Sequence, residues 1–176
     1  PTLQLKTGTV VLHALSMWQG SLPLTKGETR SGRIHRFVAF DHTLNAAERD
    51  RWKALGIRFL DPLTGHGWSV SMPASLAPER LMASGMIGMH TPTAVDKLDP
   101  ALSDALSGKG WRNRSQAVLV LPWSDLDTDA LDAVPELKGR PFEPQGEEGA
   151  RLLQLTGRTL AHLLQRTHVQ WIAPAP

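Results

Sequence analysis

Residues 37–40 read Phe-Val-Ala-Phe and residues 118–121 read Val-Leu-Val-Leu, and each run opens a stretch with the same succession of predicted elements. Each run has the length and composition of a buried strand. Residues 35–92 and 116–174 match in the order strand, helix, strand, strand, helix, strand. We interpret this succession as an internal repeat of the split βαβ, or ferredoxin-like, pattern.

The first helix of each copy is predicted after a polar turn. In the first copy it covers Leu44–Leu55, with Asn45 as a candidate N-cap. In the second copy it covers Asp125–Leu137, where apolar residues recur at helical spacing. Pro135 should end or kink this second helix about one turn early, because proline lacks the backbone donor that a helix interior needs.

The later elements also follow in matched order, after stop positions at Gly56 and Gly139. They are predicted at residues 57–60, 68–72, 77–84 and 86–92 in the first copy and at residues 140–143, 152–155, 159–167 and 169–174 in the second. Two helices on one face of an antiparallel sheet leave its other face open. The predicted fold class is α+β, with two tandem ferredoxin-like (βαββαβ) units whose antiparallel sheets are each backed by two helices.

The repeat divides the chain into four parts. They are an N-terminal extension at residues 1–34, a first unit at residues 35–92, a linker at residues 93–115, and a second unit with a proline-rich tail at residues 116–176. The extension holds one credible strand, at Thr9–Leu12. The linker holds a short helix at Asp99–Leu106 with Pro100 at its first position, followed by a hinge at Gly108–Gly110.

The composition is that of a foldable globular protein with nearly balanced charge. The 176 residues are 41% hydrophobic and 20% charged, and the net charge is +2. Two small basic clusters are interpreted as solvated surface, because neutralising phosphates needs several cations together. They are Arg30 with Arg33 and Arg36, and Trp111 with Arg112 and Arg114. We therefore expect no nucleic-acid partner.

Several other kinds of site are disfavoured. The chain has no cysteine, and its seven histidines form neither His-x-x-x-His nor His-Glu-x-x-His, so we expect no metal and no other cofactor. No apolar run approaches the roughly 20 residues that span a bilayer, so we expect no membrane partner. His66-Gly67-Trp68 is interpreted as a hairpin turn, and Gly-x-Ser-x-Gly is absent. We therefore expect no catalytic residues and a chain that is not an enzyme.

The order of these elements resembles the region before the catalytic domain in bacterial subtilisin-like (S8 family) serine proteases, with tandem units of the inhibitor I9 kind. The resemblance covers most of residues 33–174. Four short motifs carry it: Leu44–Arg49, Ala54–Ile57, Asp96–Leu98 and the ending His168–Pro174, which is similar to the last helix and strand of subtilisin propeptides.

The resemblance implies a secreted or periplasmic propeptide that acts as intramolecular chaperone and temporary inhibitor. Its partner would be the subtilisin-like catalytic domain, in cis or after cleavage. Such domains dock an open sheet face on the protease and lay a C-terminal tail in its cleft. Parallel sheets with many non-local contacts fold slowly, so a domain that binds the nearly native enzyme lowers the folding barrier.

The sequence departs from this pattern in two ways. Simple subtilisin propeptides have one such unit, whereas two are predicted here. Prolines in Ala173–Pro176 are poor neighbours for a scissile bond, so the ending is either a stiff spacer or a cleft-bound tail. The chain begins at Pro1 rather than Met, which indicates a processed or shortened N-terminus.

The candidate protease-contacting residues lie at the ends of two predicted strands. They are Trp123, expected to be exposed after Pro122, and Trp171, Ile172, Ala173, Pro174, Ala175 and Pro176. The methionine-rich group of Met72, Met82, Met86 and Met89 is interpreted as core filling.

Two alternatives remain. One is a free-standing propeptide-like inhibitor with the same fold. The other is a ferredoxin-like RNA- or ligand-binding module, which would need exposed aromatic residues on its central strands. The predicted third strands provide Trp68 in the first copy and no aromatic residue in the second.

Overall fold

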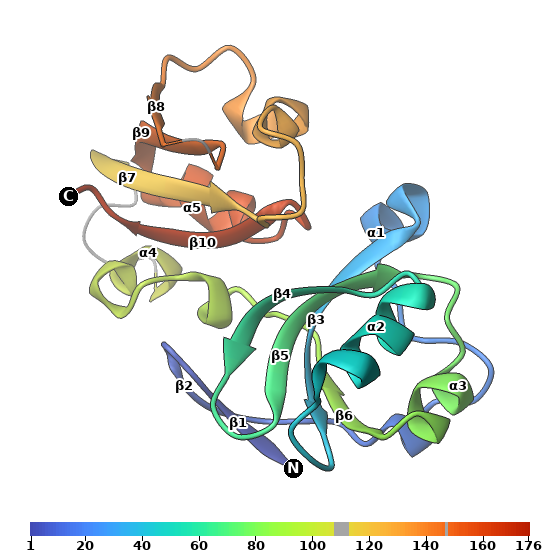
Figure 1. Ribbon diagram of the computed structural model, residues 1–176. Coiled ribbons are helices and arrows are strands. Elements are labelled where there is room, and N and C mark those ends of the chain that lie inside the picture. Colours follow the sequence, from blue (N-terminus) through green and yellow to red (C-terminus); the bar gives the residue numbers. More distant parts are fainter. Residues whose placement is uncertain (108–112, 147) are drawn as a thin grey trace. The chain divides into compact units, whose positions relative to one another are not determined.

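The computed structural model describes residues 1–107, 113–146 and 148–176. The chain forms two compact units, Pro1–Pro92 and Thr93–Pro176. Its fold is mixed α/β with antiparallel sheets, one of two strands and two of four strands in the described residues (Figure 1). None of the described helices is long and apolar enough to cross a membrane.

The first unit contains the two-stranded sheet and one four-stranded sheet. Its elements are β1 (Thr2–Leu5), β2 (Gly8–Val11), η1 (Leu15–Met17), α1 (Lys26–Ser31), β3 (Arg33–Phe40), α2 (Ala46–Ala54), β4 (Arg58–Leu63), β5 (Gly67–Pro73), α3 (Pro78–Ala83) and β6 (Met86–His90). The four-stranded sheet has the order β4-β5-β3-β6, and all its neighbouring strands are antiparallel.

One face of this sheet packs against α2 and α3. Val38 of β3 and Met72 of β5 are fully buried there, together with Trp52 of α2 and Leu81 of α3. Met86 and Met89 also lie in this core, as expected, whereas Met82 is 37% exposed. The predicted N-cap is confirmed, because the Asn45 side chain accepts a hydrogen bond from the Glu48 backbone in a capping box.

The opposite face of the first sheet carries the β1–β2 hairpin, so the expectation of an open face is wrong for this unit. Leu3 and Leu12 pack on Ala39 of β3, with Phe37 and Leu63 beside them. The expected single strand at Thr9–Leu12 is thus the second arm of a hairpin that begins at Thr2. The first arm has only four residues, which is too short for its alternation to be read.

A row of small residues makes room for the hairpin. Gly67, Ala39 and Gly88 are register partners on β5, β3 and β6. A Cβ atom at Gly67 would collide with the Leu3 side chain, and one at Gly88 would lie 2.9 Å from Leu12 Cβ. Glycine is therefore needed at both positions because another segment approaches closely.

The chain next passes around the β6 edge. The backbones of His13 and Met89 exchange two hydrogen bonds of 2.9 Å, after which Leu15 and Leu22 join the core on the helix-bearing face. Residues 1–34 are therefore an integral part of the first unit.

The second unit contains the other four-stranded sheet. Its elements are η2 (Val95–Lys97), η3 (Pro100–Leu102), α4 (Asp104–Ser107), β7 (Ser115–Pro122), η4 (Ala130–Ala133), η5 (Pro135–Leu137), β8 (Glu143–Gln145), β9 (Ala150–Thr156), α5 (Gly157–Leu163) and β10 (Val169–Pro174). The sheet order is β10-β7-β9-β8. In both four-stranded sheets the first strand in chain order therefore lies between the third and the fourth.

The helix predicted at Asp125–Leu137 is wrong, because two 3₁₀ turns, η4 and η5, stand in its place. Pro135 cannot donate to a helical ladder, and the aspartates of this segment are weak helix formers. The apolar spacing still predicted burial, since Leu131, Val134 and Leu137 all lie in the core. In the described residues, α5 and the short α4 beside it are the α-helices of this unit.

Residues 93–102, predicted as linker, belong to the second unit. Asp96 accepts hydrogen bonds from the backbone and hydroxyl of Thr93, both at 2.8 Å. The Lys97 ammonium donates to the Arg166 carbonyl at 3.0 Å, near the end of α5. Leu98 lies in the core and bridges to Ile172 of β10. Pro100 begins η3 as expected, whereas the predicted hinge at 108–110 lies outside the described residues.

Candidate functional site

The face of the second sheet that points away from its core carries an apolar strip. On β7, Val118 and Val120 are buried in the core, whereas the alternate residues Leu119 and Leu121 are half-buried and lie outside that cluster. Leu119 is the register partner of Leu152 on β9. Residues that pair across strands project from the same face.

The strip continues onto β10. Ala173 is the partner of Leu119, and Trp171 is the partner of Leu121. We call these five side chains the apolar strip: Leu119, Leu121, Leu152, Trp171 and Ala173. Trp171 and Ala173 are also half-buried.

Polar residues border the strip. Gln154 continues β9 beyond Leu152 on the same face and is exposed. Glu143 of β8, the partner of Leu152, is exposed as well. An apolar centre with a polar border is the usual composition of a protein–protein contact surface.

The C-terminal residues are part of the sheet rather than a loose tail. The Ala175 backbone donates to the Ala117 carbonyl at 3.2 Å, so the pairing with β7 reaches Ala175. On the outer edge of β10, the Ile172 carbonyl accepts from the Asp99 backbone at 2.9 Å. The backbone groups of successive residues point alternately toward β7 and toward the outer edge of β10. Pro174 occupies an outer-edge position, so its missing N–H removes no hydrogen bond to β7.

Two of the residues predicted to contact a protease are buried. Trp123 was expected to be exposed, but its exposed fraction is 1%, and its backbone donates to the His168 carbonyl. Ile172 is fully buried in the core. The expectation of exposure at Trp123 is therefore wrong, because this residue anchors the end of β7 inside the unit. Of the other predicted residues, Trp171 and Ala173 lie on the strip, and Pro174, Ala175 and Pro176 follow it.

The interpretation of Arg36 as solvated surface is also wrong. Arg36 is 1% exposed, and its guanidinium binds both Glu28 carboxylate oxygens, at 2.5 and 3.1 Å. Burial acts to raise the pKa of Glu28, but the hydrogen bond and charge of Arg36 outweigh it, so the pKa is lowered. The position of Arg36 between Ile34 and Val38, on the core face of β3, could have indicated burial.

The other predicted basic residues lie elsewhere. Arg30 and Arg114 are exposed, and Arg33 is half-buried and binds the Gly56 carbonyl at 2.8 Å. Trp111 and Arg112 lie outside the described residues.

Comparison with known families finds a match that covers most of the first unit. Residues 4–93, just over half of the chain, match a family described as a domain of unknown function (DUF8729). The chain belongs to this family. The DUF8729 range starts inside β1 and ends just after β6, so it includes both the hairpin and the sheet that the hairpin covers. No curated protein and no solved structure matches the chain.

Within the DUF8729 range, sequence reasoning also missed a polar cluster around His42. Its Nδ1 contacts Asp41 at 2.5 Å and its Nε2 contacts Glu48 at 2.6 Å. The hydrogen bonds to Glu48 and then to Asp41 raise the pKa of His42. Because both ring nitrogens contact carboxylate oxygens, the protonated ring is favoured, and neither nitrogen is available to ligate a metal.

The described residues contain no group of three or more His, Asp or Glu side chains arranged to hold a metal ion. His66 lies in the β4–β5 turn, as predicted, and its Nδ1 contacts the Thr43 hydroxyl at 2.8 Å. The most coherent candidate site is therefore the apolar strip of the second sheet.

Proposed function

We propose that the chain is the non-catalytic, propeptide-like region of a secreted or periplasmic subtilisin-like serine protease, acting as intramolecular chaperone and temporary inhibitor. In this proposal both units are ferredoxin-like repeats, and the second binds the catalytic domain through the apolar strip. The observation that carries the proposal is the difference between the two sheet faces.

The first unit shows how the corresponding sheet face can be covered by apolar side chains. There the face opposite the helices is covered by Leu3 and Leu12, each 3% exposed. The strip of the second sheet has the same place relative to its core, but its leucines are only half-buried. Each further square ångström of apolar area removed from water contributes about 25 cal/mol. A partner with an apolar surface would therefore gain by covering the strip.

The structure of β10 constrains the proposed binding. Residues up to Ala175 are already paired with β7, so a segment that enters the protease cleft would follow Ala175. Pro174 offers no donor on the outer edge of β10, which disfavours strand addition there. We propose contact through side chains on the sheet face, with Trp171 and Ala173 beside the leucines.

The RNA-binding alternative finds no comparable support. Trp68, the aromatic residue predicted for a central strand, is the register partner of Val38 and packs toward the helices. Its ring lies 5.2 Å from that of Phe59. A free-standing inhibitor would use the same strip and differs only in what is attached to the chain.

The test is to titrate residues 1–176 into a subtilisin-type protease and follow peptide hydrolysis. We expect inhibition in the nanomolar to micromolar range. Leu119→Glu should weaken it at least tenfold, because a charge would be buried at the centre of the strip. Gln154→Glu, which adds the same charge on the same face outside the strip, is the matched control.

Absence of both inhibition and calorimetric binding at high micromolar concentration would contradict the protease proposal. Equal weakening by the two variants would contradict the assignment of the contact to the strip. Circular dichroism of each variant checks that the fold is retained.

A further inference from the structure

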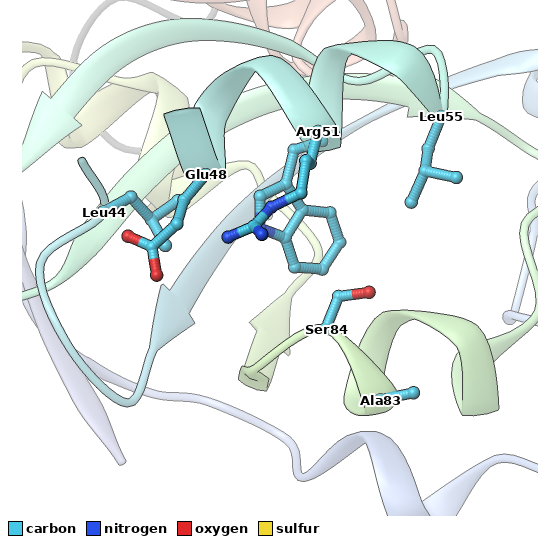
Figure 2. Close-up of a pocket in the computed structure, with 7 residues that line it drawn as sticks. Leu44, Glu48, Arg51, Leu55, Ala83 and Ser84 are labelled. Atoms are coloured by element: carbon cyan, nitrogen blue, oxygen red, sulfur yellow. The ribbon is translucent and has the colours of Figure 1, made fainter. Parts of the chain in front are cut away.

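A cleft in the first unit opens between α2 and α3, on the face of the sheet opposite the hairpin. Its volume is about 320 Å³. It is lined by Leu44, Glu48, Arg51, Trp52, Leu55, Ala83 and Ser84 (Figure 2). A volume of this size lies at the small end of ligand sites.

The inner wall of the cleft is apolar. Trp52 is 3% exposed and Leu44 is 6% exposed, and both belong to the core of the unit. Leu55 is half-buried beside them, and Ala83 contributes a methyl group from the end of α3. These side chains are fixed by the core, so the wall is preformed.

Two charged side chains project from α2 on the same side of the cleft. Figure 2 shows Glu48 and Arg51 projecting from one side of the helix, with the Arg51 guanidinium extending toward Glu48. Glu48 is already held, since its Oε2 accepts from the Asn45 backbone at 2.8 Å and its Oε1 contacts His42. The hydrogen bond from the Asn45 backbone, and after it the one to His42, lower the pKa of Glu48.

Arg51 differs from Glu48 in its interactions. It is exposed, and in the described part of the chain its guanidinium makes no hydrogen bond and no ion pair. It is close enough to Glu48 for its charge to help lower the pKa of that carboxyl. The five donors of Arg51 are therefore available to an acceptor from outside, and a carboxylate matches their planar geometry.

We propose that this cleft binds the C-terminal residue of a peptide with an apolar last side chain. The terminal carboxylate pairs with Arg51, and the apolar side chain lies against Trp52, Leu44 and Leu55. The last amide N–H donates to a remaining lone pair of Glu48. Residues three apart on a helix are about 5–6 Å apart at Cβ, so one terminal residue reaches both charged groups.

This ligand satisfies both charged side chains, which a simpler apolar acid would not. A fatty or aryl acid supplies an acceptor for Arg51 but places its apolar portion beside the Glu48 carboxylate without donating to the remaining lone pairs of that group. A cation would satisfy Glu48 but would be repelled by Arg51. The cleft lies in the first unit, so the proposal is independent of protease docking through the strip.

The test uses residues 1–176 and three probes: N-acetyl-leucine, its amide N-acetyl-leucinamide, and 4-methylpentanoate, which is N-acetyl-leucine without the acetamido group. Binding is followed by amide chemical-shift changes and by calorimetry. For ligands this small, we expect N-acetyl-leucine to bind with a Kd of roughly millimolar, with shifts concentrated at residues 44–55 and 83–84. The other two probes should bind at least fivefold more weakly, because each lacks one of the two polar contacts.

Three variants identify the residues involved. Arg51→Gln should weaken N-acetyl-leucine at least tenfold, whereas Lys53→Gln, which removes one charge from the same helix outside the cleft, should change the Kd less than twofold. Ala83→Leu should weaken all three probes by filling the cleft. Three results would each overturn the proposal. They are equal binding of the acid and its amide, an unchanged Kd in Arg51→Gln, and no chemical-shift change at a ligand concentration 20-fold above the expected Kd.

Discussion

The two four-stranded sheets share one strand order but differ in what lies on the face opposite their core. The first carries a hairpin supplied by the N-terminal residues, and the row Gly67, Ala39 and Gly88 is shaped to accept it. The second sheet carries bulkier residues at its centre, Leu119 and Leu152. In the described residues the second unit contains this one sheet and no additional hairpin to cover it. One arrangement of strands therefore has a covered face in one unit and a half-buried apolar face in the other.

The units also differ in how they bury an arginine. The side chains of Arg36 and Glu28 in the first unit are 2% and 5% exposed. In the second unit the side chain of Arg151 is 6% exposed, but its partner Asp132 is 57% exposed and remains in water. Removing a buried partner leaves an uncompensated charge, whereas water can replace an exposed one.

The largest expected effect follows from this difference. Glu28→Ala should lower the free energy of unfolding by about 3–5 kcal/mol, because it leaves the buried Arg36 without its partner. Asp132→Ala should lower it by less than about 1 kcal/mol. Urea denaturation followed by circular dichroism measures both. Equal losses would show that the two arginines are solvated alike.

A second pair of variants tests the hairpin against the strip. Leu12→Ala should cost about 2–4 kcal/mol, since Leu12 is 3% exposed between the hairpin and the sheet. Leu119→Ala should cost less than about 1 kcal/mol, because Leu119 is only half-buried. The measurement is again the urea midpoint, with 1-anilinonaphthalene-8-sulfonate binding as a probe of exposed apolar surface. A larger loss for Leu119→Ala would mean that the strip is part of a core.

Acid should weaken the first unit through Glu28. The folded-state pKa of this carboxyl is lowered, so its contribution to stability is present above its ordinary pKa, 4.5, and is lost as the pH falls through the lowered value. Thermal unfolding between pH 6 and pH 2 should show a smaller pH dependence in Glu28→Gln than in the parent chain. An unchanged slope would contradict the role of this pair.

The smallest expected effect concerns His42 of the first unit. Its folded-state pKa is raised, so its contribution to stability is present below pH 6.5, the ordinary pKa of histidine. This contribution is lost as the pH rises through the raised pKa. The thermal midpoint of the first unit should therefore fall slightly between pH 5.5 and pH 8.5, and His42→Gln should abolish this change. A change of the same size in the variant would assign the titration to another group.

Local sequence patterns predicted much of the fold. The Asn45 cap and the alternation around Val70 indicated α2 and β5, because capping and strand alternation act between near neighbours. The helix stop at Gly56 was also correct, since this residue follows the end of α2 and has a φ of 87°. Gly139 has a φ of 71° but follows the 3₁₀ turn η5 instead of the predicted helix.

The errors arose where distant residues decide the outcome. Trp123 and Arg36 carry polar or amphipathic side chains whose burial depends on groups elsewhere in the chain, such as the Glu28 carboxylate. The candidate strip was predicted in part: Trp171 and Ala173 were named, but the leucines on β7 and β9 were not. Their face could be assigned only after strand pairing had set the register.

The sequence by itself determined the mixed α/β class, the balanced charge and most strand positions, because propensity and periodicity are properties of short segments. The tertiary structure alone decided which sheet face is covered, since that depends on where the residues before β3 pack. It also decided which charged side chains are paired: Arg36 is, whereas Arg51 has no ion pair in the part of the chain that the structure describes. Both outcomes depend on contacts between residues far apart in the chain, which local patterns do not specify.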